Sequence, residues 1–338
     1  MKLKPVKNFK FLSFHLSPEL LEPASTEEKS QLTHMRESVT YWQDAMRRLR
    51  ANKVAMTSAW ILLAVLLFAW VGPMLMPYQY DQQIRGAERM APTLDPFHPF
   101  GTDNLGRDLM VRVMIGTRIS MTIGIVASLI ILIIGTTYGA ISGYLGGWVD
   151  NVMMRVVEIV YAIPDALVVI ILGISLKDPL QKLLDSGGLK AFASVGSGLI
   201  SIFLTFALLY WVSMARIVRG QVIALKGSEY VTAARAMGAK SGWIIKKHLV
   251  PNCIGTIIVT TMFQIPSAIF TESFLSFIGL GVSAPMASLG SLVNDALNGF
   301  QSYPYRLMIP AAMIAVIILA FNQFGDGLRD ALDPRMRG

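Results

Sequence analysis

The sequence predicts an all-α integral membrane protein with about six transmembrane helices. Hydrophobic residues make up 53% of the 338 residues, charged residues make up 15%, and the mean hydropathy is +0.52. A soluble domain carries about a quarter charged residues. Six stretches are apolar and long enough to cross a hydrocarbon core about 30 Å thick, which takes about 20 helical residues. They are 54–76, 118–142, 153–175, 193–215, 252–275 and 307–325.

The positions of the basic residues predict the orientation in the membrane. Cytoplasmic loops of membrane proteins carry an excess of Lys and Arg. If the N-terminus and the C-terminus are both cytoplasmic, the inside segments hold 21 of the 30 Lys and Arg residues. The net charge of +8 is then explained mainly by the basic residues of the cytoplasmic segments. Nucleic-acid binding is not expected, because the basic residues are spread over several loops.

The N-terminal segment, 1–53, is expected in the cytoplasm. It contains no apolar region followed by a cleavage site, so we predict no signal peptide and take the first span, 54–76, as an uncleaved anchor. Toward its end, Trp42, Met46 and Leu49 share one helical face, with Arg and Lys residues around it. This pattern predicts an amphipathic elbow helix lying on the inner leaflet, with a soluble docking helix as the alternative.

The segment 77–117 is predicted to be an extracytoplasmic loop. Its glycines, which include Gly101 and Gly106, allow tight turns. Asp103 and Arg107 can fix the loop through charge-assisted hydrogen bonds. We expect this structural role, with contact to an external substrate-binding protein as the alternative.

The predicted core domain, 118–328, begins with a span that carries a stripe of glycines. Glycines at this spacing let a second helix approach closely, so the stripe predicts helix packing, with a gating hinge as the alternative. The stripe consists of Gly135, Gly139, Gly143 and Gly147. A cytoplasmic tail, 329–338, follows the core domain.

Three carboxylates fall within predicted spans. Glu158 and Asp165 flank Pro164 in the third span, and Glu272 lies near the end of the fifth. Asp165 comes seven residues after Glu158, which predicts that both lie on one helix face. Such residues usually face the bundle interior or a water-filled path. Our hypothesis is that the three line a translocation path or its gate, with an interhelical hydrogen bond or an interfacial position as the alternative.

Two features follow the fifth span. The stretch SFLSFIGLGVSAPMASLG is apolar but interrupted by glycines, which predicts a re-entrant or interfacial turn rather than a straight helix. At the end of the chain, Asp326, Arg329, Asp330 and Asp333 are expected to pair locally on a solvated helix end.

A charged amphipathic segment, SEYVTAARAMGAKSGWIIKKHLVPN, lies in the predicted cytoplasmic loop 216–251. Ser228 is a good N-cap, and Glu229 then sits in the first turn, where a carboxylate suits the helix dipole. Gly238 is placed to end this helix.

A second short helix is predicted after that glycine. Ser241 can cap this helix, and Pro251 is expected to end it. Two short helices bent at a glycine form a compact knob, 229–251, of a size that enters a groove on another protein.

The knob resembles the EAA loop of bacterial ABC importer permeases. The resemblance rests on the run TAA at 232–234, on Gly238 and on Pro251. The family's usual Glu is Thr232 here, and its usual Ile and Leu before the Pro are His248 and Val250. These departures resemble the C-type membrane subunit of the oligopeptide, dipeptide and nickel branch, in which EYVTAARAMGA and HLVPN are familiar. The resemblance covers about 42–334.

The resemblance implies a type I ABC importer permease fold in a bacterial cytoplasmic membrane. The loop would be a coupling helix in a cleft of an ATPase subunit, and Lys240 would add a charge at its rim. The contact residues implied are Glu229, Tyr230, Ala233, Ala234, Arg235 and Gly238.

The resemblance also implies partners. They are a second homologous permease, two ABC ATPase subunits that bind ATP and Mg²⁺, and an extracytoplasmic substrate-binding protein, all around membrane lipid. The cargo would be oligopeptides or dipeptides, with nickel, glutathione or an oligosaccharide as alternatives.

The sequence contains no motif for chemistry of its own. It has no GxxxxGK[ST], HExxH, GxSxG or CxxC, so no cofactor, metal or catalytic residue is predicted in this chain. The one cysteine, Cys253, is expected to be a small buried apolar residue. A membrane-embedded enzyme or a passive channel are the less favoured functions, because an enzyme would need a nucleophile or metal cluster and a channel would not need the knob.

Overall fold

The computed structural model describes residues 40–186, 196–282 and 286–333. The chain divides into two compact units, Met1–Asp44 and Ala45–Gly338. Of the first unit only residues 40–44 are described, so most of the predicted N-terminal segment lies outside the described residues, as do 334–338 of the predicted tail.

Every regular element in the described residues is a helix, as the sequence predicted. Helix α2 crosses the boundary between the two units, and all later helices belong to the second unit. The helices are α2 (Tyr41–Ala51), α3 (Lys53–Trp70), α4 (Gly72–Leu75), α5 (Leu109–Leu145), α6 (Gly147–Ala162), α7 (Asp165–Asp185), α8 (Ser197–Leu209), α9 (Trp211–Leu225), α10 (Glu229–Ala236), α11 (Ser241–Ile244), the π-helix η3 (Ile245–Leu249), α12 (Val250–Asn252), α13 (Ile254–Phe277), α14 (Leu289–Leu297) and α15 (Tyr305–Leu332).

The helix lengths agree with the prediction of about six spans. Five helical segments are long and apolar enough to cross a membrane, and the bent pair of α6 and α7 makes a sixth if it is counted as one span. The five are α3, α5, α8 with α9, α13 and α15. Residues 193–195 of the predicted fourth span lie outside the described residues, and this span continues to Leu225, ten residues beyond the predicted end.

Helix α5 begins nine residues before the predicted start of the second span. Its N-cap is Asp108, whose carboxylate accepts a hydrogen bond from the Val111 N–H at 2.8 Å. The last part of the predicted 77–117 loop is therefore helical. Hydropathy did not reveal this start because the first turns contain Arg112, which is charged but buried. With 37 residues, α5 is about 55 Å long and exceeds a hydrocarbon core of about 30 Å.

The third predicted span, 153–175, is not one straight helix. Helices α6 and α7 meet at an angle of 84°, with Ile163 in an extended conformation (ψ 132°) before Pro164. A residue before proline is driven out of the α region by the proline ring. The prediction that Glu158 and Asp165 share one helix face is therefore wrong, because they lie on different helices.

The glycine stripe packs α5 against α9. A Cβ added at Gly135 would lie 2.6 Å from Met214 Cβ, and one at Gly143 would lie 2.8 Å from the Arg219 carbonyl oxygen. A Cβ at Gly139 would meet the Ala215 carbonyl oxygen. The packing role is confirmed at these three glycines. It is wrong for Gly147, which has φ +55° and open space around it, because α5 ends at Leu145.

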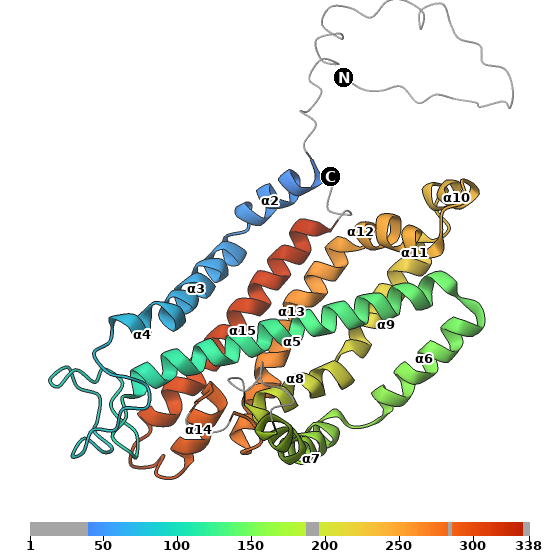
Figure 1. The fold of residues 1–338 in the computed structure, drawn as a ribbon. Helices are drawn as coiled ribbons and strands as arrows, with labels where there is room; N and C mark the ends of the chain where they lie inside the picture. Colours follow the sequence, from blue (N-terminus) through green and yellow to red (C-terminus); the bar gives the residue numbers. More distant parts are fainter. Residues whose placement is uncertain (1–39, 187–195, 283–285, 334–338) are drawn as a thin grey trace, which may run out of the picture. The chain divides into compact units, whose positions relative to one another are not determined.

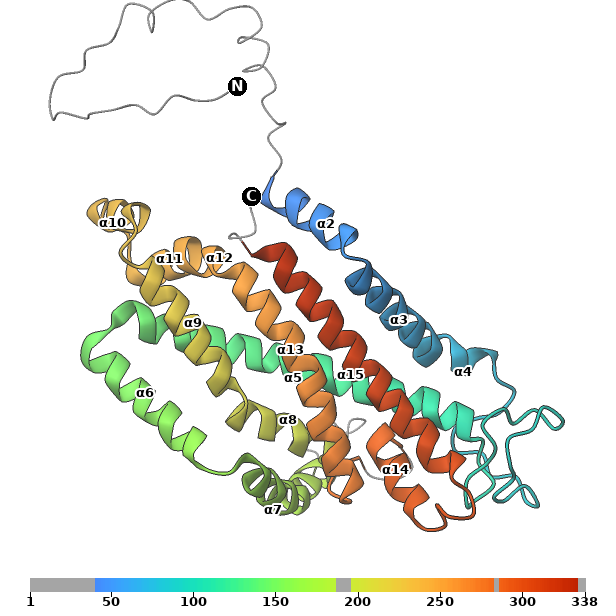
Figure 2. The same cartoon turned by 180° about the vertical axis from the view of Figure 1, so that it is seen from behind.

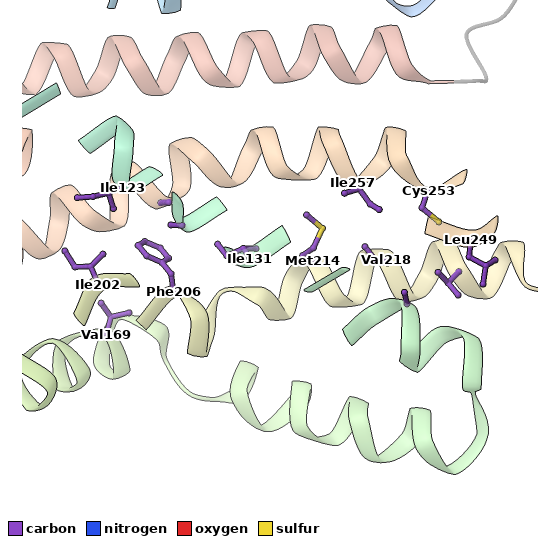
Figure 3. Packing of buried hydrophobic residues seen from close by; sticks show 14 of the residues in the cluster. Ile123, Ile131, Val169, Ile202, Phe206, Met214, Val218, Leu249, Cys253 and Ile257 are labelled. Atoms are coloured by element: carbon purple, nitrogen blue, oxygen red, sulfur yellow. The ribbon is translucent and has the colours of Figure 1, made fainter. Parts of the chain in front are cut away.

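One cluster of buried apolar side chains runs along α5, α9 and α13 (Figure 3). At one end it includes Val169 of α7 and Ile202 of α8. At the other end it includes Leu249 of η3 and Cys253. The cluster therefore connects the knob to the helix pair α7 and α8 through continuous side-chain contact.

The knob and the predicted extracytoplasmic loop lie at opposite ends of the second unit (Figures 1 and 2). The corner between α5 and α6 lies at the knob end, and α14 lies at the loop end. We call residues 76–108 together with α14 the cap.

The cap is fixed by polar contacts. Asp103 accepts a hydrogen bond from Arg107 Nε at 2.6 Å, which confirms the predicted Asp–Arg pair. Gly101 and Gly106 have φ of +76° and +72°, as expected for glycines in tight turns. His98 Nδ1 lies 2.7 Å from Asp108 Oδ2, and both side chains are buried.

The cap is also joined to α15, whose Tyr305 hydroxyl donates to the Met90 carbonyl oxygen at 2.8 Å. The stretch after Glu272 is not one straight helix, as predicted, although residues 283–285 lie outside the described residues. Helix α13 ends at Phe277, and the nine-residue α14 begins at Leu289 with a capping box formed by Ser288 and Ser291.

Candidate functional site

The first half of the knob is α10 with its C-terminal turn. Gly238 has φ +81°, its N–H donates to the Arg235 carbonyl oxygen at 3.0 Å, and the Ala239 N–H donates to the Ala234 carbonyl oxygen at 3.1 Å. These two bonds define a Schellman motif with Gly238 at C′. The prediction that Gly238 ends the helix is confirmed.

Ser228 is the N-cap residue, as predicted, but its hydroxyl donates back to the Leu225 carbonyl oxygen at 2.7 Å instead of capping α10. The second helix starts at Ser241 with Lys240 as its N-cap residue, so the predicted cap at Ser241 is off by one residue. The prediction that Pro251 ends it is wrong. Pro251 lies in the first turn of α12, where its missing N–H is tolerated, and the chain continues through the π-helix and α12 into α13.

The knob has a buried underside and an exposed outer face. Val231, Ala234, Ile244 and Leu249 are buried in the cluster that runs along α5, α9 and α13. Of the six predicted contact residues, five are exposed: Glu229, Tyr230, Ala233, Arg235 and Gly238. The sixth, Ala234, is buried and holds α10 against the bundle.

Apolar and aromatic side chains stand on the outer face. Met237 is 81% exposed and Trp243 is 49% exposed. The His248 ring packs edge-on against Trp243, with a centroid distance of 4.9 Å, and lies 6.1 Å from the Tyr230 ring. An exposed apolar patch with polar neighbours is typical of a protein contact surface.

Charged side chains of the knob and of the turn before it contact the corner between α5 and α6. Arg235 lies over the Tyr144 ring at 5.5 Å. Lys226 Nζ donates to the Gly143 carbonyl oxygen at 3.1 Å, at the C-terminal end of α5. Deeper in the bundle, Arg219 of α9 donates two hydrogen bonds of 2.6 Å to the carboxylate of Asp150 in α6.

The carboxylates predicted to line a path fall into two environments. Glu158 is exposed, pairs with Arg155 at 2.8 Å, and lines a cavity of about 670 Å³ between α6 and α9. Asp165 is exposed at the start of α7 and lines a second cavity of about 460 Å³. Both residues face open space in this chain.

Glu272 lies elsewhere and is fully buried. Its carboxylate accepts hydrogen bonds from the hydroxyls of Ser120 at 2.8 Å and Ser276 at 2.7 Å. Ser120 lies on α5, so Glu272 joins α13 to α5. This geometry favours the alternative reading of Glu272, an interhelical hydrogen bond.

Comparison with known proteins decides the family. The sequence model described as the binding-protein-dependent transport system inner membrane component matches residues 135–338. The chain belongs to this family. A second model, the N-terminal transmembrane domain of oligopeptide transport permease C, matches residues 40–92.

Several relatives match most of the chain. It is 41% identical to the oligopeptide transport system permease protein OppC of Bacillus subtilis, over 96% of this chain and 99% of the relative. It is 45% identical to the dipeptide transport system permease protein DppC of the same organism, over 89% and 88%. It is 41% identical to OppC of Escherichia coli K12, over 89% and 93%. This permease is therefore a multi-span membrane protein.

Sequence reasoning missed the polar contacts that join α9 and the turn before the knob to α5 and α6. Asp150, Arg219 and Lys226 carry no local motif, because their partners are 69 to 83 residues away in the chain.

Cys253 is buried, as predicted, and burial raises the pKa of its thiol to about 11. Among the described residues, no group of three His, Cys, Asp or Glu side chains is arranged to hold a metal ion.

Proposed function

We propose that this chain is a permease subunit of an ATP-driven importer that moves oligopeptides or dipeptides across the bacterial cytoplasmic membrane. The relatives that match nearly the whole chain carry the names of oligopeptide and dipeptide transport permeases. With both termini in the cytoplasm, as the basic residues predict, the knob is cytoplasmic and the cap faces outside.

The knob is proposed as the contact with an ABC ATPase subunit. Its outer face presents Glu229, Tyr230, Ala233 and Met237, while its underside belongs to the cluster that reaches α7 and α8. ATP and Mg²⁺ bound by two such ATPase subunits would favour one arrangement of the knob over another. A coupling of this kind needs contacts that differ between two states, and the packed cluster offers a continuous route for it.

The remaining partners follow from the same proposal. A second homologous permease would complete the path, and an extracytoplasmic binding protein would deliver peptide to the cap. Glu158 and Asp165 are proposed to line this chain's share of the path, because both border cavities along α6, α7 and α9. Glu272 is assigned a structural role.

Substitutions at Gly238 test the coupling role. Gly238→Val forces a β-branched residue to φ +81°, although a Cβ there meets no atom within 4 Å. We expect the variant to insert normally but to lose about tenfold in peptide uptake and in ATPase co-purification. Gly238→Asn should behave nearly as the wild type, because Asn tolerates this conformation.

Gly227→Val is the matched control. Gly227 also has open space, but its φ lies outside the left-handed region. Normal uptake by Gly238→Val would reject the coupling role. Recovery of the wild-type chain from its own membranes without any ATPase would favour a channel or an enzyme, and uptake of nickel, glutathione or an oligosaccharide instead of peptide would correct the cargo.

A further inference from the structure

The groove between α6 and α9 is bordered by the side chain of Arg216, which has no carboxylate partner among the described residues. The cavity of about 670 Å³ is bordered by Arg155, Glu158, Arg216 and Arg219. The cavity of about 460 Å³ is bordered by the next residues along α6 and by the start of α7 and of α9, including Tyr161, Asp165 and Tyr210.

One stacked pair has a member in the lining of each cavity. The Arg216 guanidinium lies over the Tyr161 ring at 4.0 Å from the ring centroid. Arg216 borders the larger cavity and Tyr161 borders the smaller one. A guanidinium stacked on an aromatic face keeps its N–H groups free at the edges of its plane.

The three arginines of the larger cavity differ in their partners. Arg155 is paired with Glu158, and Arg219 is paired with Asp150. Among the described residues, Arg216 has no carboxylate within ion-pair distance, although its side chain is only partly exposed. Arg216 therefore has an aromatic partner but no carboxylate, and it borders a cavity, so the edges of its guanidinium are available to an anionic ligand.

We propose that Arg216 binds the C-terminal carboxylate of the transported peptide and that Tyr161 positions the Arg216 guanidinium for this contact. The proposal rests on the proposed function. Every peptide with a free end carries this carboxylate whatever its side chains, so the contact suits a carrier of varied peptides. The guanidinium fork matches a carboxylate through two parallel hydrogen bonds. Asp165 in the neighbouring cavity offers negative charge to the peptide's ammonium group.

The test compares two peptides in the complete transporter, purified with its partner subunits and reconstituted in vesicles. One peptide has a free C-terminus and the other is the same peptide with an amidated C-terminus. Arg216→Gln should lower transport of the free acid about tenfold, since a charge-assisted hydrogen bond is lost. It should leave transport of the amide unchanged. Comparing each variant with the wild type for the same peptide cancels any preference of the binding protein.

Three further variants sharpen this test. Arg155 borders the same cavity but is already paired with Glu158. Arg155→Gln should therefore change transport of both peptides by the same factor. Tyr161→Phe keeps the stacked ring and should behave as the wild type. Tyr161→Leu loses the ring and should lower transport of the free acid, in the same direction as Arg216→Gln.

Chemical rescue covers the case in which Arg216→Gln does not assemble. Arg216→Cys treated with a cationic methanethiosulfonate should regain transport of the free acid, and an anionic reagent should not restore it. Arg216→Gln treated in parallel controls for other thiols, and Cys253 is buried.

Several outcomes overturn the proposal. Equal transport of both peptides by wild type and Arg216→Gln does so while leaving the proposed function intact. An equal loss for both peptides that depends on the fraction of anionic lipid would assign Arg216 to a lipid phosphate instead. If the wild-type transporter moves no peptide, the proposed function fails and this inference fails with it.

Discussion

Helices α6 and α9 lie on either side of one groove, yet they are held in opposite ways. Helix α9 lies against the glycine stripe of α5, with its backbone at van der Waals distance, and buries six of its fifteen residues. Helix α6 buries two of its sixteen residues, Asp150 and Val157. We infer that α5 and α9 form a rigid seam, whereas α6 is an arm held by few contacts. These are the Asp150–Arg219 ion pair, the buried Val157, the hydrogen bond from the Tyr138 hydroxyl to the Met153 carbonyl oxygen at 2.8 Å, and the stack of Arg216 on Tyr161. The groove bordered by Arg216 lies where α6 does not pack tightly against α9.

The largest effect is expected from breaking the seam. Gly139→Leu places a side chain against the backbone of Ala215 and should lower the free energy of unfolding by about 3 kcal/mol. Unfolding of the purified chain in mixed detergent micelles measures it. Gly220→Leu, on α9 with no atom within 4 Å of the added Cβ, is the control. It should not destabilise the chain and should raise stability by up to about 1 kcal/mol, because leucine is a better helix former than glycine. Equal effects would contradict the rigid seam.

The next effect concerns the polar tie of the arm. Asp150→Asn removes a carboxylate that accepts two hydrogen bonds of 2.6 Å from Arg219. We expect a loss of about 2 kcal/mol, below the value for a fully buried pair, because the Arg219 side chain is 32% exposed. A double-mutant cycle with Arg219→Gln should show non-additivity of about 1 kcal/mol. Strictly additive losses would mean that this ion pair does not hold α6.

The apolar tie of the arm should have a smaller effect. Val157 is fully buried, whereas Ile159, two residues along the same helix, is 65% exposed. Val157→Ala should lower the free energy of unfolding by about 1.5 kcal/mol. Ile159→Ala removes more atoms but should change it by less than about 0.5 kcal/mol. The same unfolding assay compares the two variants, and a larger loss for Ile159→Ala would reverse our assignment of the faces of α6.

The last prediction concerns reactivity rather than stability. Cys253 lies in the packed cluster at the seam, and burial raises the pKa of its thiol to about 11. The thiolate is the reactive form, so alkylation should rise about tenfold per pH unit between pH 7 and 10. At pH 8 it should be about a hundredfold slower than alkylation of a Met237→Cys, Cys253→Ser variant on the exposed knob. Similar rates at pH 8 would show that the cluster opens to solvent.

The sequence by itself determined the helical membrane class, the approximate spans, the glycine packing and the turn at Gly238. These features depend on local physics: apolar length, the spacing of small residues, and a backbone conformation that glycine adopts easily. The resemblance in the knob was enough to identify the family. Local signals also misled. Glu158 and Asp165 were predicted on one helix face although Pro164 between them bends the span sharply, and Pro251 was predicted to end a helix although it lies within one.

Only the tertiary structure decided which charged residues are paired and which face open space. Glu158, Asp165 and Glu272 look alike in the sequence, yet Glu272 is enclosed by serine hydroxyls and the other two border cavities. Arg219 has a carboxylate partner from a distant helix, whereas Arg216 meets the ring of Tyr161. The reason is physical: the free energy of a charge in a membrane protein depends on partners that folding brings together from far along the chain, and no local pattern records them.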